Sequence, residues 1–376
     1  VCKDILLLSM RFLTADYLYP LSSDPIKEGV LQVTDKGEII SVFSDRKTLS
    51  KENVELYNGI LCPGFINAHC HLELSHLSGI AGKGLLDFID SIKKRSDFTE
   101  KEILKSIENA ENQMINNGIV GVGDICNTSD TIYQKQKGNL AYYNFIEIFS
   151  LREENFNQII FSAKELKSQF RAVGLKATIS PHSPYSVPPK LAKEIAINYD
   201  KKDELLSIHM QESDYENELF RNKSGKMFNW VKNIPNCDEI WNMRNRSIDI
   251  LKELGDLKFL LVHNTFSRKE DLGYNYYCTC PKANLYIENR LPDYSIFNPE
   301  KLCVGTDSLA SNNSLSVLDE LQIIQANSNF NLNELLKIAS KNGAEALGFK
   351  KLGTFEKGKT PGVNLISGLN KVEVIL

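Results

Sequence analysis

Two histidines separated by one residue, His69 and His71, have a spacing that suits metal binding. On an extended backbone, residues i and i+2 point to the same side, so both imidazoles can reach one ion. A His-x-His pair alone is a weak signal, because many such histidines are ordinary buried residues. The pair therefore predicts half of a metal site and needs further ligands from elsewhere in the chain.

Three later runs end in residues that could complete such a site. Ser207-Ile-His-Met-Gln-Glu212 contains His209, Leu261-Val-His-Asn264 contains His263, and Cys303-Val-Gly-Thr-Asp-Ser308 contains Asp307. An aspartate that ends an apolar strand is costly to bury unless a cation or hydrogen-bond donors compensate its charge. Each residue also has an ordinary alternative: a buried histidine, a solvated Glu212, or an aspartate that caps the following helix. Together they favour His209 as a third nitrogen ligand and Asp307 as an oxygen ligand and proton acceptor.

The elements that must position these residues follow a repeated pattern of short β-branched runs and longer amphipathic segments, typical of βα units. We expect helices over residues 99–117, 153–170, 188–199, 239–254 and 331–347. Such an alternation indicates a (β/α)8 TIM barrel, in which catalytic residues collect at the carboxyl ends of the strands. The eight predicted strands end near Ile66, Cys126, Phe149, Ile179, His209, His263, Cys280 and Thr306.

The two ends of the chain predict a second, smaller domain. Short apolar runs alternate with turn residues over 4–8, 29–33 and 38–43, and two more strand-like runs cover 364–366 and 371–376. We expect a small β-sandwich domain from residues 1–58 plus 354–376. The barrel would be the catalytic domain, over residues 59–353.

The composition favours a small-molecule enzyme. Apolar residues make up 42% and charged residues 24%, and a net charge of −4 provides no basic field for nucleic acid or a membrane surface. Eight scattered cysteines, several inside apolar runs, indicate reduced thiols in a reducing compartment. No run approaches the roughly 20 apolar residues that cross a bilayer, and no secretory signal is recognised. We therefore expect a cytoplasmic protein.

The run Pro63-Gly-Phe-Ile-Asn-Ala-His-Cys-His71 resembles the first-strand signature of the amidohydrolase superfamily. The resemblance covers essentially the whole chain and includes the runs at 180–187, 280–284 and 342–348. It is strongest to the branch that contains cytosine, guanine and S-adenosylhomocysteine deaminases and triazine chlorohydrolases. Within that branch the chain is most similar to the aminofutalosine deaminases.

This resemblance implies one divalent ion, zinc with iron as the alternative. In other branches a carboxylated lysine at the end of the fourth strand bridges two ions, but His182 stands there, so a single ion is expected. The implied ligands are His69, His71, His209 and Asp307. The implied substrate-handling residues are His182, Glu212 and His263.

The implied reaction is hydrolytic deamination. Asp307, assisted by His263, would accept a proton from water activated by the ion. Glu212 would protonate a ring nitrogen of the substrate, and ammonia would leave.

The substrate is indicated by Glu73, because the His-Leu-Glu-Leu-Ser pattern resembles aminofutalosine deaminases of menaquinone biosynthesis, where this glutamate can contact a ribose diol. Capping of a helix is its alternative. A benzoate group would need a cation, for which Arg152 and Arg290 are candidates, although most such residues are surface charges. Ser308, beside Asp307, is a further candidate contact.

These observations favour 6-amino-6-deoxyfutalosine as the substrate. The alternatives are S-adenosylhomocysteine, methylthioadenosine, adenosine or guanine deamination, a chlorohydrolase on the same scaffold, and a noncatalytic barrel. Enzymes of this group are often dimers, so a homodimer is an open alternative to a monomer.

Overall fold

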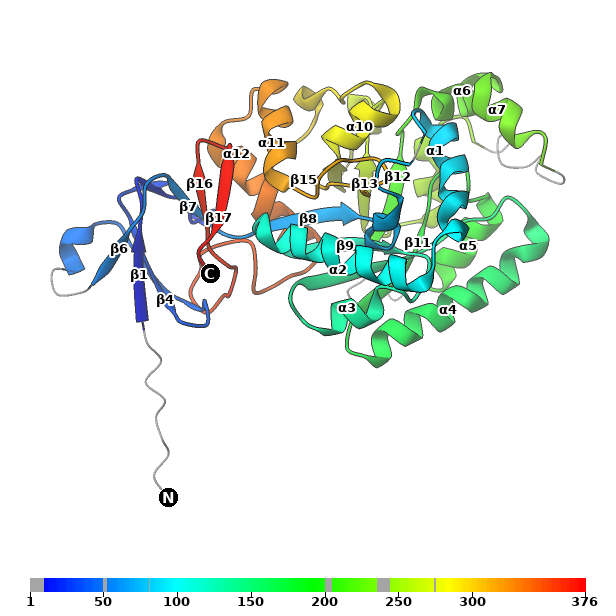
Figure 1. Ribbon diagram of the computed structural model, residues 1–376. Coiled ribbons are helices and arrows are strands. Elements are labelled where there is room, and N and C mark those ends of the chain that lie inside the picture. The colour runs from blue at the N-terminus through cyan, green and yellow to red at the C-terminus, as the bar shows by residue number, and fades with distance from the viewer. Residues whose placement is uncertain (1–9, 50–52, 81, 200–204, 235–243, 274) are drawn as a thin grey trace.

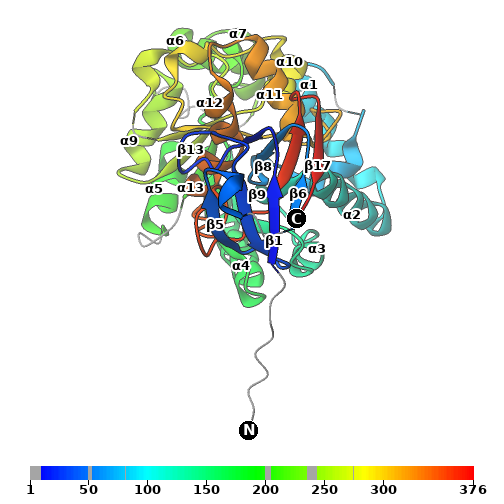
Figure 2. The same cartoon turned by 90° about the vertical axis from the view of Figure 1, so that its left-hand side faces the viewer.

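The computed structural model describes residues 10–49, 53–80, 82–199, 205–234, 244–273 and 275–376. A ring of parallel strands surrounded by helices makes up most of this part of the chain, and two small sheets lie beside it (Figures 1 and 2). The predicted strand at 4–8, Cys2 and Cys237 lie outside the described residues. Among the described residues, no helix has both the length and the apolar character that a membrane span requires.

Eight strands form the ring, as two four-stranded parallel sheets in the orders β11-β10-β9-β8 and β12-β13-β14-β15. The predicted (β/α)8 barrel is confirmed. The strands are β8 (Phe65–Cys70), β9 (Ile119–Cys126), β10 (Ala141–Ile148), β11 (Lys176–Pro181), β12 (Leu206–Met210), β13 (Phe259–His263), β14 (Tyr276–Thr279) and β15 (Leu302–Val304).

Backbone contacts join the two sheets at both junctions. Between β11 and β12, the His209 amide donates to the His182 carbonyl at 2.9 Å. Between β15 and β8, the amides of Thr306 and Asp307 donate to the His69 carbonyl at 3.1 and 3.0 Å. Gly305 permits this approach, because a Cβ there would lie 2.7 Å from the His69 carbonyl oxygen. The ring is therefore closed beside the candidate metal ligands.

The strands read as continuous apolar runs because both of their faces are buried. Along β13, Leu260 and Val262 belong to a cluster with residues from five other barrel strands. Their neighbours Phe259 and Leu261 belong to the larger cluster that also contains helix residues. This alternation is the period of two expected of a strand.

Helices cover the outside of the ring, and each predicted helical region contains helix where it is described. In α2, Thr99 and Glu102 form the capping box expected from a Thr-x-x-Glu sequence. Residues 239–243 of the predicted helix 239–254 lie outside the described residues. The helices are α1 (Leu85–Ile92), α2 (Glu100–Asn116), α3 (Ile132–Gln136), α4 (Phe156–Ala172), α5 (Pro189–Ile197), α6 (Asp214–Asn222), α7 (Gly225–Val231), α9 (Ile250–Leu254), α10 (Pro281–Glu288), α11 (Val317–Ala326), α12 (Leu332–Leu336) and α13 (Asn342–Ala346).

Short helical turns complete the elements that connect these strands and helices. A π-helical turn, η8, joins α12 to α13, so the predicted region 331–347 is helical almost throughout. The 3-10 turns are η1 (Arg46–Leu49), η2 (Leu72–Leu77), η3 (Lys93–Asp97), η4 (Glu153–Asn155), η5 (Ser247–Asp249), η6 (Lys269–Asp271) and η7 (Tyr294–Ile296), and η8 covers Lys337–Lys341.

Both ends of the described chain contribute to the two small sheets, which lie side by side in Figures 1 and 2. One has the order β5-β4-β1-β6 and the other β17-β16-β7-β2-β3. Leu13 and Leu31 of the first sheet share a buried cluster with Leu61 and Leu365 of the second. The strands are β1 (Met10–Thr14), β2 (Tyr17–Leu18), β3 (Ile26–Lys27), β4 (Val30–Thr34), β5 (Ile39–Phe43), β6 (Val54–Leu56), β7 (Ile60–Cys62), β16 (Asn364–Ser367) and β17 (Lys371–Val374).

The prediction of one strand that ends near Ile66 was wrong. Pro63 and Gly64 divide the run into β7, which pairs with β16 and β2, and β8, which continues through His69 to Cys70. Proline cannot donate a ladder hydrogen bond and glycine favours a break, so a single continuous strand is disfavoured there. The expected domain boundary at 58/59 thus falls before β7, whereas the barrel strand itself begins at Phe65.

The six described cysteines, 62, 70, 126, 278, 280 and 303, are buried free thiols. This agrees with the expectation of reduced cysteines. Burial raises the pKa of Cys70 and Cys126 well above the usual thiol value, so these two thiols stay protonated.

We expect stability to fall as the pH rises towards 8, because Glu216 on α6 and Glu320 on α11 are fully buried. Burial raises the pKa of each to about 8. Between the unfolded value of about 4.3 and about 8, only the folded form keeps these protons, so raising the pH favours unfolding by up to about 1.4 kcal/mol per pH unit for each group. Urea unfolding from pH 5 to 9 tests this. Glu216→Gln should reduce the slope, whereas Glu194→Gln, at an exposed position, should not.

Candidate metal centre

Three imidazole nitrogens and one carboxylate oxygen converge at the carboxyl ends of β8, β12 and β15. The His71 Nε2 atom lies 3.2 Å from Nε2 of His69 and 3.2 Å from Nε2 of His209. The Oδ1 atom of Asp307 lies 3.7 Å from Nε2 of His69 and 3.5 Å from Nε2 of His71. The side chains of His69, His209 and Asp307 are more than nine-tenths buried, and that of His71 is 11% exposed.

The spacing of these atoms fits a shared cation. Ligand atoms about 2.1 Å from a tetrahedral ion stand about 3.4 Å apart, close to the separations seen here. The Nε2 atom of a neutral imidazole has either one hydrogen or one lone pair, so Nε2 of His71 cannot form hydrogen bonds with both neighbouring nitrogens. A divalent ion among the four atoms would satisfy all of them.

The protonation states suit metal binding. Burial lowers the pKa of His71 to about 3 and holds the pKa of His209 well below its usual value, which keeps both imidazoles neutral. Burial raises the pKa of Asp307, but the neighbouring histidines outweigh it and leave that pKa below its usual range. Neutral imidazole and ionised carboxylate are the forms that coordinate a metal.

The backbone turns sharply where the strands end. His263 has a φ of 69° and Asp307 a φ of 58°, in the left-handed region that residues other than glycine rarely adopt. Strained backbone of this kind clusters at functional sites. A hydrogen bond also orients the Asp307 carboxylate, because the Ser311 hydroxyl donates to its Oδ2 atom at 2.6 Å.

Glu212 and His263 lie together next to this cluster. The Oε1 atom of Glu212 is 3.5 Å from Nε2 of His263, and both residues are buried. Nδ1 of His263 lies 2.8 Å from Oδ1 of Asn284, which orients the ring. His263 also belongs to a triad with His69 and His209 whose nitrogens could hold an ion.

His182 and the buried acid Glu147 lie on the far side of His209. The His182 ring centroid is 4.9 Å from that of His209, and its Nδ1 atom lies 2.6 Å from the Ser186 hydroxyl. Sequence reasoning missed Glu147, the penultimate residue of β10, whose Oε1 lies 3.5 Å from Nδ1 of His209. Its signal was a glutamate inside an apolar strand run, at 141–148.

The structure does not turn Glu73 towards an open site. Its Oε2 accepts hydrogen bonds from the Asn127 amide, the Thr128 amide and the Thr128 hydroxyl, each at 3.0 Å. Its Oε1 lies 3.5 Å from Arg95. Glu73 thereby ties the turn after His71 to the loop after β9.

The other expected substrate contacts are dispersed. Arg152 is exposed beyond the end of β10, with no carboxylate partner among the described residues. Arg290 is exposed, and its guanidinium lies over the Phe266 ring at 4.7 Å. Ser308 is buried, with its hydroxyl 3.2 Å from that of Ser311.

A buried ion pair fixes the segment that follows β8 and carries His71. The Oδ1 atom of Asp124 on β9 accepts from the Leu72 amide at 2.8 Å, directly after His71. Its Oδ2 atom pairs with Lys135 of α3 at 2.5 Å, and both side chains are fully buried. Lys135 also donates to Asn144 at 2.6 Å. The pair therefore fixes the chain where it leaves β8.

Asp124→Asn is expected to destabilise the fold by about 3–5 kcal/mol, because it leaves the Lys135 ammonium buried without an anion. Urea unfolding measures the change. The double variant Asp124→Asn with Lys135→Met should regain part of this stability, since removal of both charges relieves the desolvation. A double variant no more stable than the single variant would contradict this explanation.

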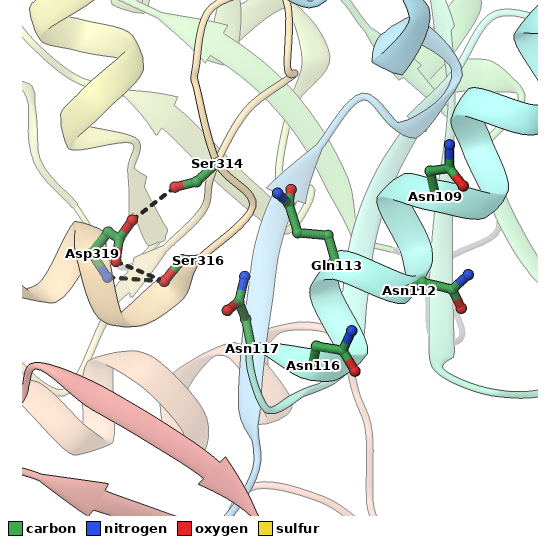
Figure 3. Close-up of a pocket in the computed structure, with 8 residues that line it drawn as sticks. All are labelled: Asn109, Asn112, Gln113, Asn116, Asn117, Ser314, Ser316 and Asp319. Carbon is green, nitrogen blue, oxygen red and sulfur yellow. Dashed lines mark hydrogen bonds between the residues drawn. The ribbon is translucent and has the colours of Figure 1, made fainter.

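Two surface pockets lie outside the cluster itself. One, of about 480 Å³, lies between α2 and the loop that leads into α11, and its walls carry amide side chains such as Asn112 and Gln113 (Figure 3). It contains none of the expected site residues. Another, of about 580 Å³, reaches Ser311, which donates to Asp307, and is also lined by Leu309 and Tyr286.

The chain matches a known protein family over most of its length. A model described as the amidohydrolase family matches residues 60–374. An adenosine deaminase from Helicobacter pylori is 29% identical over 318 residues, which cover 80% of this chain and 77% of that protein. An aminodeoxyfutalosine deaminase from a Nitratiruptor species is 28% identical over 339 residues, which cover 84% and 82%.

Solved structures share the fold. Helicobacter pylori aminofutalosine deaminase in complex with methylthio-coformycin superposes with a TM-score of 0.81 at 24% identity, covering 95% of this chain and 92% of that one. A zinc-bound adenosine deaminase from Xanthomonas campestris gives a TM-score of 0.73 at 19% identity, covering 94% and 84%.

Proposed function

This chain belongs to the amidohydrolase family, hydrolases that act on carbon–nitrogen bonds, and we propose that it deaminates an adenine nucleoside. The observation that carries the proposal is the convergence of His69, His71, His209 and Asp307 beside Glu212 and His263. Both halves of a hydrolytic deamination, activation of water and protonation of the ring, have a candidate group there.

We propose zinc as the ion, with iron as the alternative. Three imidazole nitrogens and one carboxylate oxygen are a donor set that zinc accepts, and expansion to five ligands would admit a water. Such an ion, when bound, supplies a nucleophile by lowering the pKa of water from 15.7 to about 7.

Asp307 and His263 are the proposed proton acceptors. The Ser311 hydroxyl holds Oδ2 of Asp307, so this carboxylate keeps one orientation while it takes a proton. His263 is held through Nδ1, and its buried Nε2 has no hydrogen-bond partner among the described residues. That nitrogen is available to a proton in transit.

Glu212 is the proposed acid. Burial raises the pKa of Glu212 to about 7, against the opposing effect of His263, so the carboxyl group carries a proton near neutral pH. A general acid works best when its pKa lies near the working pH. Proton transfer from Glu212 to the ring nitrogen makes the adjacent carbon more electrophilic.

Within this class we propose 6-amino-6-deoxyfutalosine as the substrate, as in menaquinone biosynthesis. The aminodeoxyfutalosine deaminase relative, matched over most of both chains, supports this choice. So does the mouth of the barrel, where the Phe149 side chain is 53% exposed with its ring 5.5 Å from that of His182. Together with the exposed Arg152, it offers an aromatic surface and a cation that suit a benzoate.

Ammonia release from purified, zinc-loaded protein tests this proposal. We expect kcat/KM for 6-amino-6-deoxyfutalosine to exceed that for adenosine, methylthioadenosine and S-adenosylhomocysteine by at least about tenfold, the value of one lost polar contact. Arg152→Gln should raise KM for the benzoate substrate and leave adenosine unaffected, and Arg290→Gln is the parallel test of the second cation. Equal rates on all four nucleosides would contradict the benzoate assignment, and no ammonia from any of them would contradict the deaminase.

A further inference from the structure

Glu147 is a buried acid that the proposed reaction does not use. It is the penultimate residue of β10 and is 8% exposed, and its Oε1 atom is buried without a hydrogen-bond partner among the described residues. A buried carboxylate is costly unless a positive group compensates its charge. The nearest imidazole atom recorded for Oε1 is Nδ1 of His209, at 3.5 Å.

The orientation of the His209 ring explains why Glu147 can influence a bound ion. Its Nε2 atom faces the other ligand nitrogens, so Nδ1 must carry the hydrogen when Nε2 binds an ion. That hydrogen points to the His182 carbonyl at 2.9 Å and lies beside Glu147. Coordination draws electrons from the ring and makes this N–H more positive, which strengthens its attraction to a nearby carboxylate.

Asn127 holds Glu147 in place. Its side-chain amide donates to the Glu147 carbonyl at 3.2 Å and to Oε2 at 3.3 Å, while its backbone amide donates to Glu73 at 3.0 Å. The two acids therefore hold the loop after β9 from two sides, Glu73 from η2 and Glu147 from β10. Glu147 has a fixed position relative to both His71 and His209.

We propose that Glu147 is a positioning residue that acts through His209 and raises the affinity of the site for a divalent ion. This inference rests on the proposed metal-dependent function. Oε1 is buried beside Nδ1 of His209, so Glu147 acts on the ion through this imidazole.

The test is zinc affinity, measured on the whole protein by competition with a chromogenic chelator. Glu147→Gln keeps the size but puts an amide that cannot ionise in place of the carboxyl group, and Glu147→Met removes the polar atoms as well. We expect each to weaken zinc binding by about 10–100-fold, the usual effect of losing an outer partner of a metal-bound histidine. Glu111→Gln is the matched control, because Glu111 is another fully buried carboxyl, on α2, bonded to Tyr142 at 2.8 Å.

Two further measurements separate positioning from a general effect on folding. The metal-free variants should melt close to the wild type, because glutamine and methionine nearly keep the volume of the side chain and Oε2 accepts one hydrogen bond among the described residues, from Asn127. The visible spectrum of the cobalt-loaded protein should change in both Glu147 variants and not in Glu111→Gln. Unchanged zinc affinity in Glu147→Gln, or an equal loss in the control, overturns this inference alone. A wild-type protein that binds no divalent ion overturns the proposed function and this inference with it.

Discussion

Asp307→Asn is expected to lower kcat by about 10³–10⁴-fold, because one substitution removes both an anionic ligand and the proposed proton acceptor. The asparagine is nearly isosteric and can still accept from Ser311, so the loop after β15 should keep its position. Steady-state ammonia release with excess zinc measures the loss.

The control for this prediction is Ser311→Ala, which removes the hydroxyl that orients Oδ2 of Asp307 and leaves its charge in place. We expect it to cost about tenfold, the value of one hydrogen bond to a charged group. Zinc content should be measured in parallel for both variants. If Asp307→Asn keeps more than a tenth of the wild-type kcat, Asp307 is not the proton acceptor of the proposed reaction.

Glu212→Gln is expected to lower kcat by about 10²–10⁴-fold with little change in zinc affinity, because Glu212 is not a proposed ligand. Glutamine can occupy the same space beside His263 but cannot deliver a proton to the ring nitrogen. Stopped-flow measurement of the change in purine absorbance separates this loss from product release.

Glu216→Gln is the matched control for Glu212→Gln. Glu216 lies four residues further along the chain and is also fully buried, but its Oε1 atom accepts from the Gln211 amide at 3.1 Å. We expect nearly wild-type kcat from it. If both variants lose activity equally, the loss at Glu212 reflects packing and not proton transfer.

Much of the fold could be predicted from the sequence, because barrel strands buried on both faces read as continuous apolar runs. The polar residues that end such runs, His209, His263 and Asp307, stand out since burial of each is costly without a partner. The ends of parallel barrel strands meet at one edge, so residues distant in the chain could be expected to lie together.

Other features depend on contacts that no local pattern encodes. The proposed role of Glu147 depends on His209, which lies 62 residues later in the chain. The packing of β10 and β12 brings Oε1 of Glu147 to 3.5 Å from Nδ1 of His209. The pairing of Asp124 with Lys135 depends on how α3 folds back onto β9. The orientation of the Glu73 side chain could not be predicted either, because its hydrogen-bond partners lie in the loop after β9.

The most direct test of the central claim is metal removal and restoration in the wild-type protein. Dialysis against a chelator should reduce ammonia release from 6-amino-6-deoxyfutalosine to background, and one equivalent of zinc per chain should restore it. Far-ultraviolet circular dichroism should show that the stripped protein stays folded. Full activity in folded protein that contains no divalent ion would contradict the account.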